Sequence, residues 1–280
     1  MNRFLKLLHM EVSRFWKLYV TLFVMTLFMQ CGGILYESNK YMQVVKDKMG
    51  PATSTFAKFA AENGVVSFSD MMSRANLFIL APIALCIGGL ALYVFLIWYR
   101  EWMGKNMFIY RLLMLPTERR HLYLAKLSAI LLFVFGLVAF QLLILPLESA
   151  LFTSVVDQEL RGGAETLTSV IQNHSFLQIL VPRTFTELIL YYGSGALFVI
   201  ILFTAILLER SYRLKGIVAG VIYIGVACLL LIAPMLIMNR DINDYLYPNE
   251  IFIIEFIIAV LIGAMSLAIS FFLMNKKISV

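Results

Sequence analysis

Six apolar runs, each close to the length that a helix needs to cross a bilayer, dominate this sequence of 280 residues. A spanning helix takes about 20 mostly apolar residues, because backbone groups inside hydrocarbon must pair within the helix. Apolar residues make up 61% of the chain and charged residues only 14%, against roughly 25% charged in soluble domains. The sequence therefore predicts an all-α membrane protein, with residues 1–280 forming a single transmembrane domain. We place the spans at about 18–36, 77–99, 122–147, 188–208, 216–238 and 251–274.

The segment before the first span has the pattern of an amphipathic helix. Within residues 2–19, apolar side chains fall on one face and basic side chains on the other. Such a helix lies in the headgroup plane of a membrane. The alternative is that these residues are simply the first turns of a long first span. The apolar face would comprise Phe4, Leu5, Leu8, Val12, Phe15, Trp16 and Tyr19.

The distribution of charge predicts the orientation of the spans. With both termini in the cytoplasm, 15 of the 23 Lys and Arg residues lie in inner segments and 13 of the 17 acidic residues in outer ones. Short cytoplasmic loops carry an excess of Lys and Arg. The same bias explains the net charge of +6, so we expect membrane lipid and no nucleic acid as a partner of the basic residues.

Two outer segments are long and keep apolar side chains. They run from Glu37 to Asn76 and from Glu148 to Glu187. Segments of this kind lie on the outer leaflet, dip into it, or cap the helix bundle. The third outer loop, between spans five and six, is short and polar.

Motifs for catalysis, nucleotide binding and metal binding are missing from the sequence. It has no GxxxxGK[ST] loop for phosphates, and its three histidines and three cysteines are scattered. The run Tyr192-Gly193-Ser194-Gly195 resembles the serine motif of rhomboid proteases, but lacks the first glycine and a later histidine. We therefore predict no enzymatic activity and no metal or cofactor bound by this chain, and we assign Gly193 and Gly195 to close helix packing.

Few polar groups fall inside the predicted spans. Glu187 and Glu255 lie near outer ends, and Gln141 lies within the third span. Intramembrane ionisable residues usually mark ion pathways. A chain of them is missing here, which argues against a proton- or sodium-driven carrier. Glu255 is either a functional group or a side chain that extends to the outer headgroups.

The polar segment between the second and third spans, residues 100–126, is the most distinctive stretch for function. It carries six cations and two acids, and its middle has apolar residues at helical spacing. Proline disfavours helical geometry in the preceding residue and lacks an N–H. We therefore predict a short cytoplasmic helix over 102–115 that ends at Leu115-Pro116.

This arrangement resembles the permease subunits of ABC-2-type ABC transporters. The shared features are an amphipathic N-terminal helix, six spans, and an inner segment with an acidic residue, a short helix, a Leu-Pro turn, a basic residue and a lysine. In this chain these are Glu101, the helix 102–115, Leu115-Pro116, Arg119 and Lys126. The family often has Glu-x-x-x-Gly-Thr in this segment, whereas Lys105 follows Gly104 here.

The resemblance implies an exporter subunit of a cell membrane, expected to be bacterial, with both termini cytoplasmic. Helix 102–115 would be a coupling helix seated in a groove of a separate ATPase. Two ATPase subunits would bind ATP and Mg²⁺, and a second permease, identical or homologous, would complete the complex. The apolar lining suggests an amphipathic or lipid-like cargo such as a peptide or antibiotic. The expected coupling residues are Glu101, Met103, Met107, Tyr110, Arg111, Met114, Leu115, Pro116, Arg119 and Arg120.

One alternative from another functional class stays open at this stage. A bundle of this kind could be a structural or immunity-type membrane protein that acts without ATP. Resting on lipid headgroups is likewise an alternative role for helix 102–115. Co-purification with an ATPase separates these possibilities.

Overall fold

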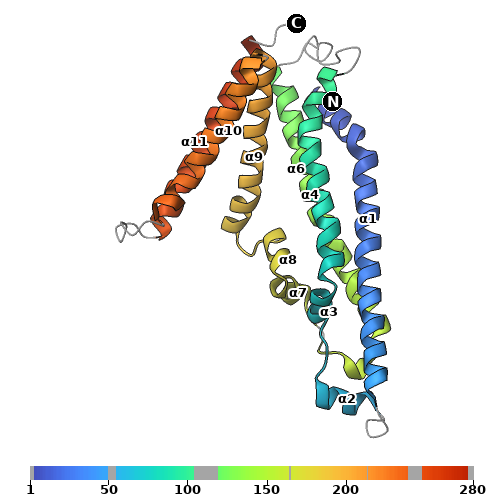
Figure 1. The fold of residues 1–280 in the computed structure, drawn as a ribbon. Coiled ribbons are helices and arrows are strands. Elements are labelled where there is room, and N and C mark those ends of the chain that lie inside the picture. Colours follow the sequence, from blue (N-terminus) through green and yellow to red (C-terminus); the bar gives the residue numbers. More distant parts are fainter. Residues whose placement is uncertain are drawn as a thin grey trace. The chain divides into compact units, whose positions relative to one another are not determined.

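The computed structural model describes residues 3–49, 55–103, 119–163, 165–212, 214–238 and 248–276. Within these ranges the regular elements are all helices, and Val66 and Arg161 form an isolated parallel bridge. Six of the helices are long and apolar enough to cross a membrane, which confirms the predicted class of a multi-pass helical protein. These six are α1 (Arg3–Lys48), α4 (Asn76–Met103), α6 (Arg119–Val155), α9 (Phe185–Tyr212), α10 (Leu214–Met238) and α11 (Pro248–Lys276), shown in Figure 1.

The long helices extend beyond the predicted spans. α1 is a single helix of 46 residues, so the separate amphipathic helix 2–19 is not seen as an element of its own. Its buried positions include Leu7, Glu11, Phe15 and Tyr19, spaced by four, whereas Trp16 of the predicted apolar face is exposed. The first part of the chain thus follows the alternative of a long first helix.

Both predicted outer segments begin inside helices. α1 continues through Glu37 to Lys48, and α6 continues through Glu148 to Val155. The reason is that neither segment has a helix-breaking signal at its start, and Pro146 lies within α6 without ending it. Polarity marks where a helix leaves hydrocarbon, not where the helix ends.

The chain folds into two compact units. Unit 1 comprises Met1–Glu11, Val94–Ala129 and Thr186–Val280, and unit 2 comprises Val12–Tyr93 and Ile130–Phe185. Helices α1, α4 and α6 contribute residues to both units, while α9, α10 and α11 lie in unit 1 apart from the first residue of α9. The units are described separately below.

In unit 1, α9, α10 and α11 pack closely. Gly216 and Gly220 of α10 face the backbone of α9, and a Cβ at either position would crowd Leu208 or Ala205. Buried hydroxyl groups also connect these helices, since Thr204 Oγ1 lies 2.9 Å from Ser270 Oγ. Hydroxyl pairs and small residues are common at helix interfaces in membranes.

The predicted packing role of Gly193 and Gly195 is wrong within the described structure. A Cβ at Gly195 would meet no atom within 4 Å, and one at Gly193 would touch only Ile189 of its own helix. A glycine in a membrane span does not always mark a close contact between two helices. The motif alone therefore did not show which glycines lie at such contacts. Glu255 of α11 is exposed.

In unit 2, one end of the long helices is covered by short helices that we call the cap. The cap comprises α2 (Phe56–Asn63), α3 (Phe68–Arg74), η1 (Gln158–Leu160), α7 (Leu167–Asn173) and α8 (Ser175–Leu180). It shares a core with α1, α4 and α6 that includes Val45, Phe59, Met72, Phe152 and Leu177. The expectation that the outer segments cap the bundle agrees with this packing.

The two parts of the cap, one after α1 and one after α6, are held together by hydrogen bonds. Ser67 caps α3 in a capping box with Asp70, and Ser69 N and Oγ both donate to the Glu165 carboxylate, at 2.9 and 2.8 Å. Such boxes satisfy the free N–H groups at a helix start. The segments that follow α1 and α6 therefore form one structure.

Away from the cap, the long helices of unit 2 contact one another through aromatic rings and amides. Phe15 and Tyr93 have ring centroids 3.9 Å apart, and Phe23 stacks on Phe140 at 4.0 Å. Gln30 and Gln141 donate to each other, at 3.1 and 3.2 Å, and both are buried. The predicted intramembrane polar residue Gln141 thus has a reciprocal partner on α1.

Candidate coupling site at the ends of the 104–118 segment

The predicted coupling residues are divided between described and undescribed parts of the chain. Glu101 and Met103 lie in the last turn of α4, and Arg119 and Arg120 in the first turn of α6. The other predicted coupling residues, Met107, Tyr110, Arg111, Met114, Leu115 and Pro116, lie outside the described residues. The structure therefore shows how the helix ends on either side of residues 104–118 are held in place.

The two arginines at the start of α6 contact the end of α11. Arg119 donates through Nη1 to the carbonyl oxygen of Met274 at 2.6 Å. The guanidinium of Arg120 lies 5.8 Å from the centre of the Phe271 ring. Carbonyl groups at a helix C-terminus that lack a partner within the helix favour a nearby cation. The Arg119 hydrogen bond therefore connects the start of α6 to the end of α11.

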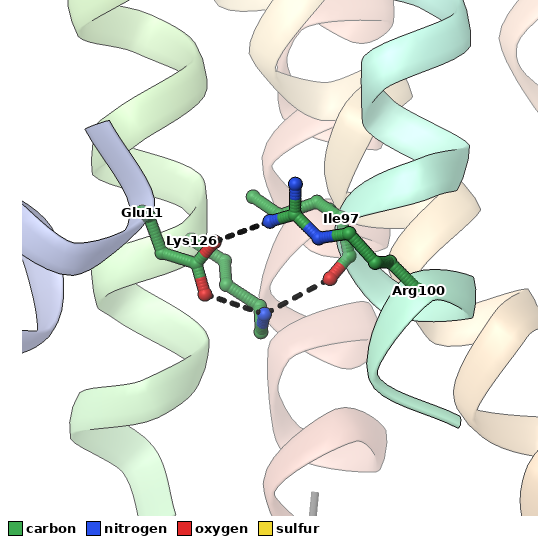
Figure 2. Close-up of polar contacts among 4 residues, drawn as sticks. All are labelled: Glu11, Ile97, Arg100 and Lys126. Atoms are coloured by element: carbon green, nitrogen blue, oxygen red, sulfur yellow. Dashed lines mark hydrogen bonds and ion pairs between the residues drawn. The ribbon is translucent and has the colours of Figure 1, made fainter. Parts of the chain in front are cut away.

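A buried ion-pair group lies just inside this junction. Lys126 Nζ donates to Glu11 Oε1 at 2.8 Å and to the Ile97 carbonyl oxygen at 3.0 Å. Arg100 Nη2 lies 3.6 Å from the other carboxylate oxygen of Glu11. The Glu11 and Lys126 side chains are fully buried, whereas that of Arg100 is 41% exposed. Figure 2 shows how one carboxylate faces both cations, from α1, α4 and α6.

The electrostatics of this group favour a fixed geometry. Taking a carboxylate and an ammonium out of water costs several kcal/mol for each ion, and only close pairing recovers that cost. The ammonium has two oxygen acceptors and also lies 5.1 Å from the centre of the Trp98 ring. Moving α1 away from α6 would leave both charges buried without each other.

Aromatic rings surround this ion-pair group. Trp98 and Tyr123 each meet Phe203 of α9 edge to face, with centroids 5.5 Å apart, and Tyr123 meets Phe271 of α11 at the same distance. Edge-to-face pairs add about 0.5–1.5 kcal/mol beyond area burial. The same rings therefore connect α4 and α6 to α9 and α11.

A second polar contact joins the end of α4 to α9. The Tyr99 hydroxyl donates to the Glu209 carboxylate. The Arg210 guanidinium lies 4.7 Å from the centre of the Tyr99 ring. Within unit 1, the helix ends on both sides of the 104–118 segment are thus attached to α1, α9 and α11.

Sequence reasoning missed the pairing of Glu11 with Lys126, although a signal was present. Lys126 falls on the buried face of α6 with Tyr123, Ala129 and Ile130. Glu11 interrupts an apolar stripe of α1 in the same way. One acid and one base on two apolar faces predict a buried pair.

Metal binding finds no support in the described part of the chain, where no three His, Cys, Asp or Glu side chains form a possible metal site. Comparisons with protein-family models, with curated proteins and with solved structures found no match to this chain. The functional assignment therefore depends on the geometry above and on the sequence pattern.

Proposed function

We propose that this chain is the transmembrane subunit of an ABC-2-type exporter. It would move an amphipathic or lipid-like molecule out of the cytoplasm, and a separate ATPase would supply the energy. Six helices able to cross a membrane provide the required bundle. The attached ends of the 104–118 segment provide a route for force.

The observation that carries this proposal is the attachment of both ends of that segment by buried contacts. Its α4 end is attached to the Glu11 carboxylate through Arg100 and to Lys126 through the carbonyl oxygen of Ile97. Its α6 end is attached to the same carboxylate through Lys126. Close-packed interiors transmit displacement because they compress little. A push on the segment would therefore move the helix ends together and would not be absorbed by a loose loop.

The sequence of the segment suits a helical contact with a partner. Met107, Tyr110 and Met114 fall at helical spacing, and an apolar helix face is what a groove on another protein binds. Methionine adapts to a partner surface that changes shape. The partner would be one of two cytoplasmic ATPase subunits that hold ATP and Mg²⁺, and a second permease would share the complex.

Affinity purification of the full chain from the membranes of its own host tests the proposal. We expect an ATPase subunit to co-purify, identified by mass spectrometry and by ATP hydrolysis. The double variant Met107→Asp/Tyr110→Asp should reduce its recovery at least ten-fold without lowering the unfolding temperature. Lys215→Glu, at the other predicted cytoplasmic turn, is the matched control and should retain the ATPase.

Two outcomes would overturn the proposal. Retention of the ATPase by the double variant at the wild-type level would remove the segment from the contact. Absence of any ATPase from the purified wild-type protein would favour the alternative of a structural or immunity-type protein that acts without ATP.

A further inference from the structure

Glu148 is a buried acid that the coupling site does not use. It lies within α6 and is fully buried, and neither carboxyl oxygen has a hydrogen-bond partner among the described residues. Leu145 and Phe152, one turn to either side, belong to the apolar core shared with the cap. An ionised carboxylate without a counter-charge is too costly in such surroundings. Burial therefore favours the protonated, uncharged form of the Glu148 carboxyl group until a cation reaches it.

Other buried polar groups lie on α1 in unit 2. Thr26, Gln30 and Ser38 of α1 are buried at spacings of four and eight residues, which places them on one face of that helix. Ser38 Oγ also has no hydrogen-bond partner in the described structure. The Cys31 thiol on α1 is a titratable group within electrostatic reach of Glu148. Thr26 and Gln30 have hydrogen-bond partners, so Ser38 is the member of this row that resembles Glu148 in lacking one among the described residues.

An apolar cavity of about 100 Å³ lies in the same unit. Thr26, Cys86, Leu137, Gln141 and Leu180 are among the residues that line it, from α1, α4, α6 and the cap. An engineered apolar cavity of about 150 Å³ holds benzene, so this one accepts a smaller apolar group such as the end of an alkyl chain. Glu148 lies seven residues beyond Gln141 on α6, two turns and about 10 Å along the helix.

We propose that Glu148 binds the positively charged group of an amphipathic amine, whose apolar part occupies this cavity. The carboxyl releases its proton to solvent as the ammonium arrives, so that R–NH₃⁺ and Glu–COOH give the ion pair and one H⁺. The site then contains one positive and one negative charge. The idea that this amine is the exported molecule rests on the proposed export function. The binding of the amine at Glu148 does not depend on that function.

The charge of the site decides the class of ligand. An anion would meet a carboxyl group that, once ionised, repels it. A neutral lipid would fill the cavity but leave Glu148 unused. An alkylammonium ion satisfies both features, because its charged end pairs with the carboxyl group and its apolar end fills the cavity.

Carbodiimide labelling of the purified full-length protein tests this site without any ATPase. Dicyclohexylcarbodiimide modifies protonated carboxyl groups in apolar surroundings, and mass spectrometry locates the adduct. We expect an adduct at Glu148 that dodecylammonium reduces at least five-fold and that dodecanol, of equal chain length, leaves unchanged. Glu148→Gln keeps the neutral shape and should abolish the adduct, whereas Glu255→Gln, at an exposed acid, should retain it.

Proton release provides a second measurement. Dodecylammonium should release a proton from the wild-type protein and from Glu255→Gln, but not from Glu148→Gln. An unlabelled Glu148, equal protection by dodecanol, or equal proton release by Glu148→Gln would each overturn the inference. Because no partner is present, these results stand apart from the outcome of the co-purification experiment.

Discussion

One carboxylate, that of Glu11, faces both cations at the junction of α1, α4 and α6. Breaking a buried pair by removing one partner costs more than replacing both partners by apolar groups, because the single change leaves a buried charge behind. The stability of unit 1 should therefore depend on the pair in a non-additive way.

Lys126→Met is expected to lower the free energy of unfolding by about 3–5 kcal/mol. The double variant Glu11→Leu/Lys126→Met should lose less than this single variant, because no buried charge remains. Thermal unfolding in detergent measures both. Lys40→Met removes the ion pair with Glu37, 3.6 Å long, in which the Lys40 side chain is 58% exposed, and should cost less than about 1 kcal/mol. A double variant as unstable as the sum of its singles would contradict this account.

His174 lies at the junction of α7 and α8 in the cap. It is buried, its Nδ1 has no hydrogen-bond partner in the described structure, and burial lowers its pKa below the usual value of 6.5. Burial disfavours the charged imidazolium. The unfolded cap therefore binds more protons than the folded cap between the lowered pKa and 6.5, so its stability falls as the pH drops through this window.

Hydrogen exchange over residues 167–180 should become faster when the pH falls from 7.5 to 5.5, after correction for intrinsic rates. His174→Leu, which cannot be protonated, should show the same protection at both values. A wild-type cap with pH-independent protection would contradict the role of His174. Exchange in α10, remote in sequence from the cap, is the internal control.

At the scale of helices, close approach depends on a few glycines. Gly32 and Gly33 are neighbours on α1, yet a Cβ at Gly33 would collide with Cβ and Cγ of Phe78 on α4, whereas one at Gly32 would meet no atom within 4 Å. The two positions differ in their contacts and hardly at all in their sequence surroundings. They form a matched pair for testing the α1–α4 packing in unit 2.

Gly33→Ala should destabilise the protein by about 1–3 kcal/mol, because the added methyl group must displace the Phe78 side chain at its base. Gly32→Ala should be neutral or stabilising by up to about 1 kcal/mol, because alanine favours a helix over glycine. The two variants are compared by their unfolding temperatures in the same detergent. Equal effects would mean that α1 and α4 do not pack as described.

The helical class and the six long apolar helices could be predicted from the sequence, because apolar length is a strong signal in each span. The short helices of the cap could not, since they lack that signal. Helix ends could not. Glu37 and Glu148 look like loop residues by polarity, yet α1 and α6 continue through them into the capped region, where Phe59, Leu177 and other cap residues bury the extra turns. Long-range packing decides those boundaries.

The coupling site shows the same limit. The pattern from Glu101 to Arg119 predicts a coupling segment, but the contact of Arg119 with Met274 joins residues 155 apart in sequence. The partner of Glu11 is 115 residues away. Pairings at such separations are set by the fold, although unpaired charges on apolar faces mark the residues that need a partner.

For the whole molecule, the charge distribution makes a prediction about orientation. Lys58 in α2 and Lys215 in α10 are both exposed, and the predicted topology places them on opposite sides of the membrane. In a cysteine-free background, Lys215→Cys should react with a membrane-impermeant maleimide only after the cells are opened, and Lys58→Cys in intact cells. The reverse pattern would exclude the proposed cytoplasmic position of the 104–118 segment.

The length of α1 determines where the cap stands. Its 46 residues make a rod about 70 Å long, more than twice the roughly 30 Å of bilayer hydrocarbon. If the membrane takes residues 18–36, the twelve residues from Glu37 to Lys48 rise about a further 18 Å, and Val45 near their end packs with Phe59 of α2. The cap then lies beyond the hydrocarbon of the bilayer, and the last turns of α1 set its distance from the membrane.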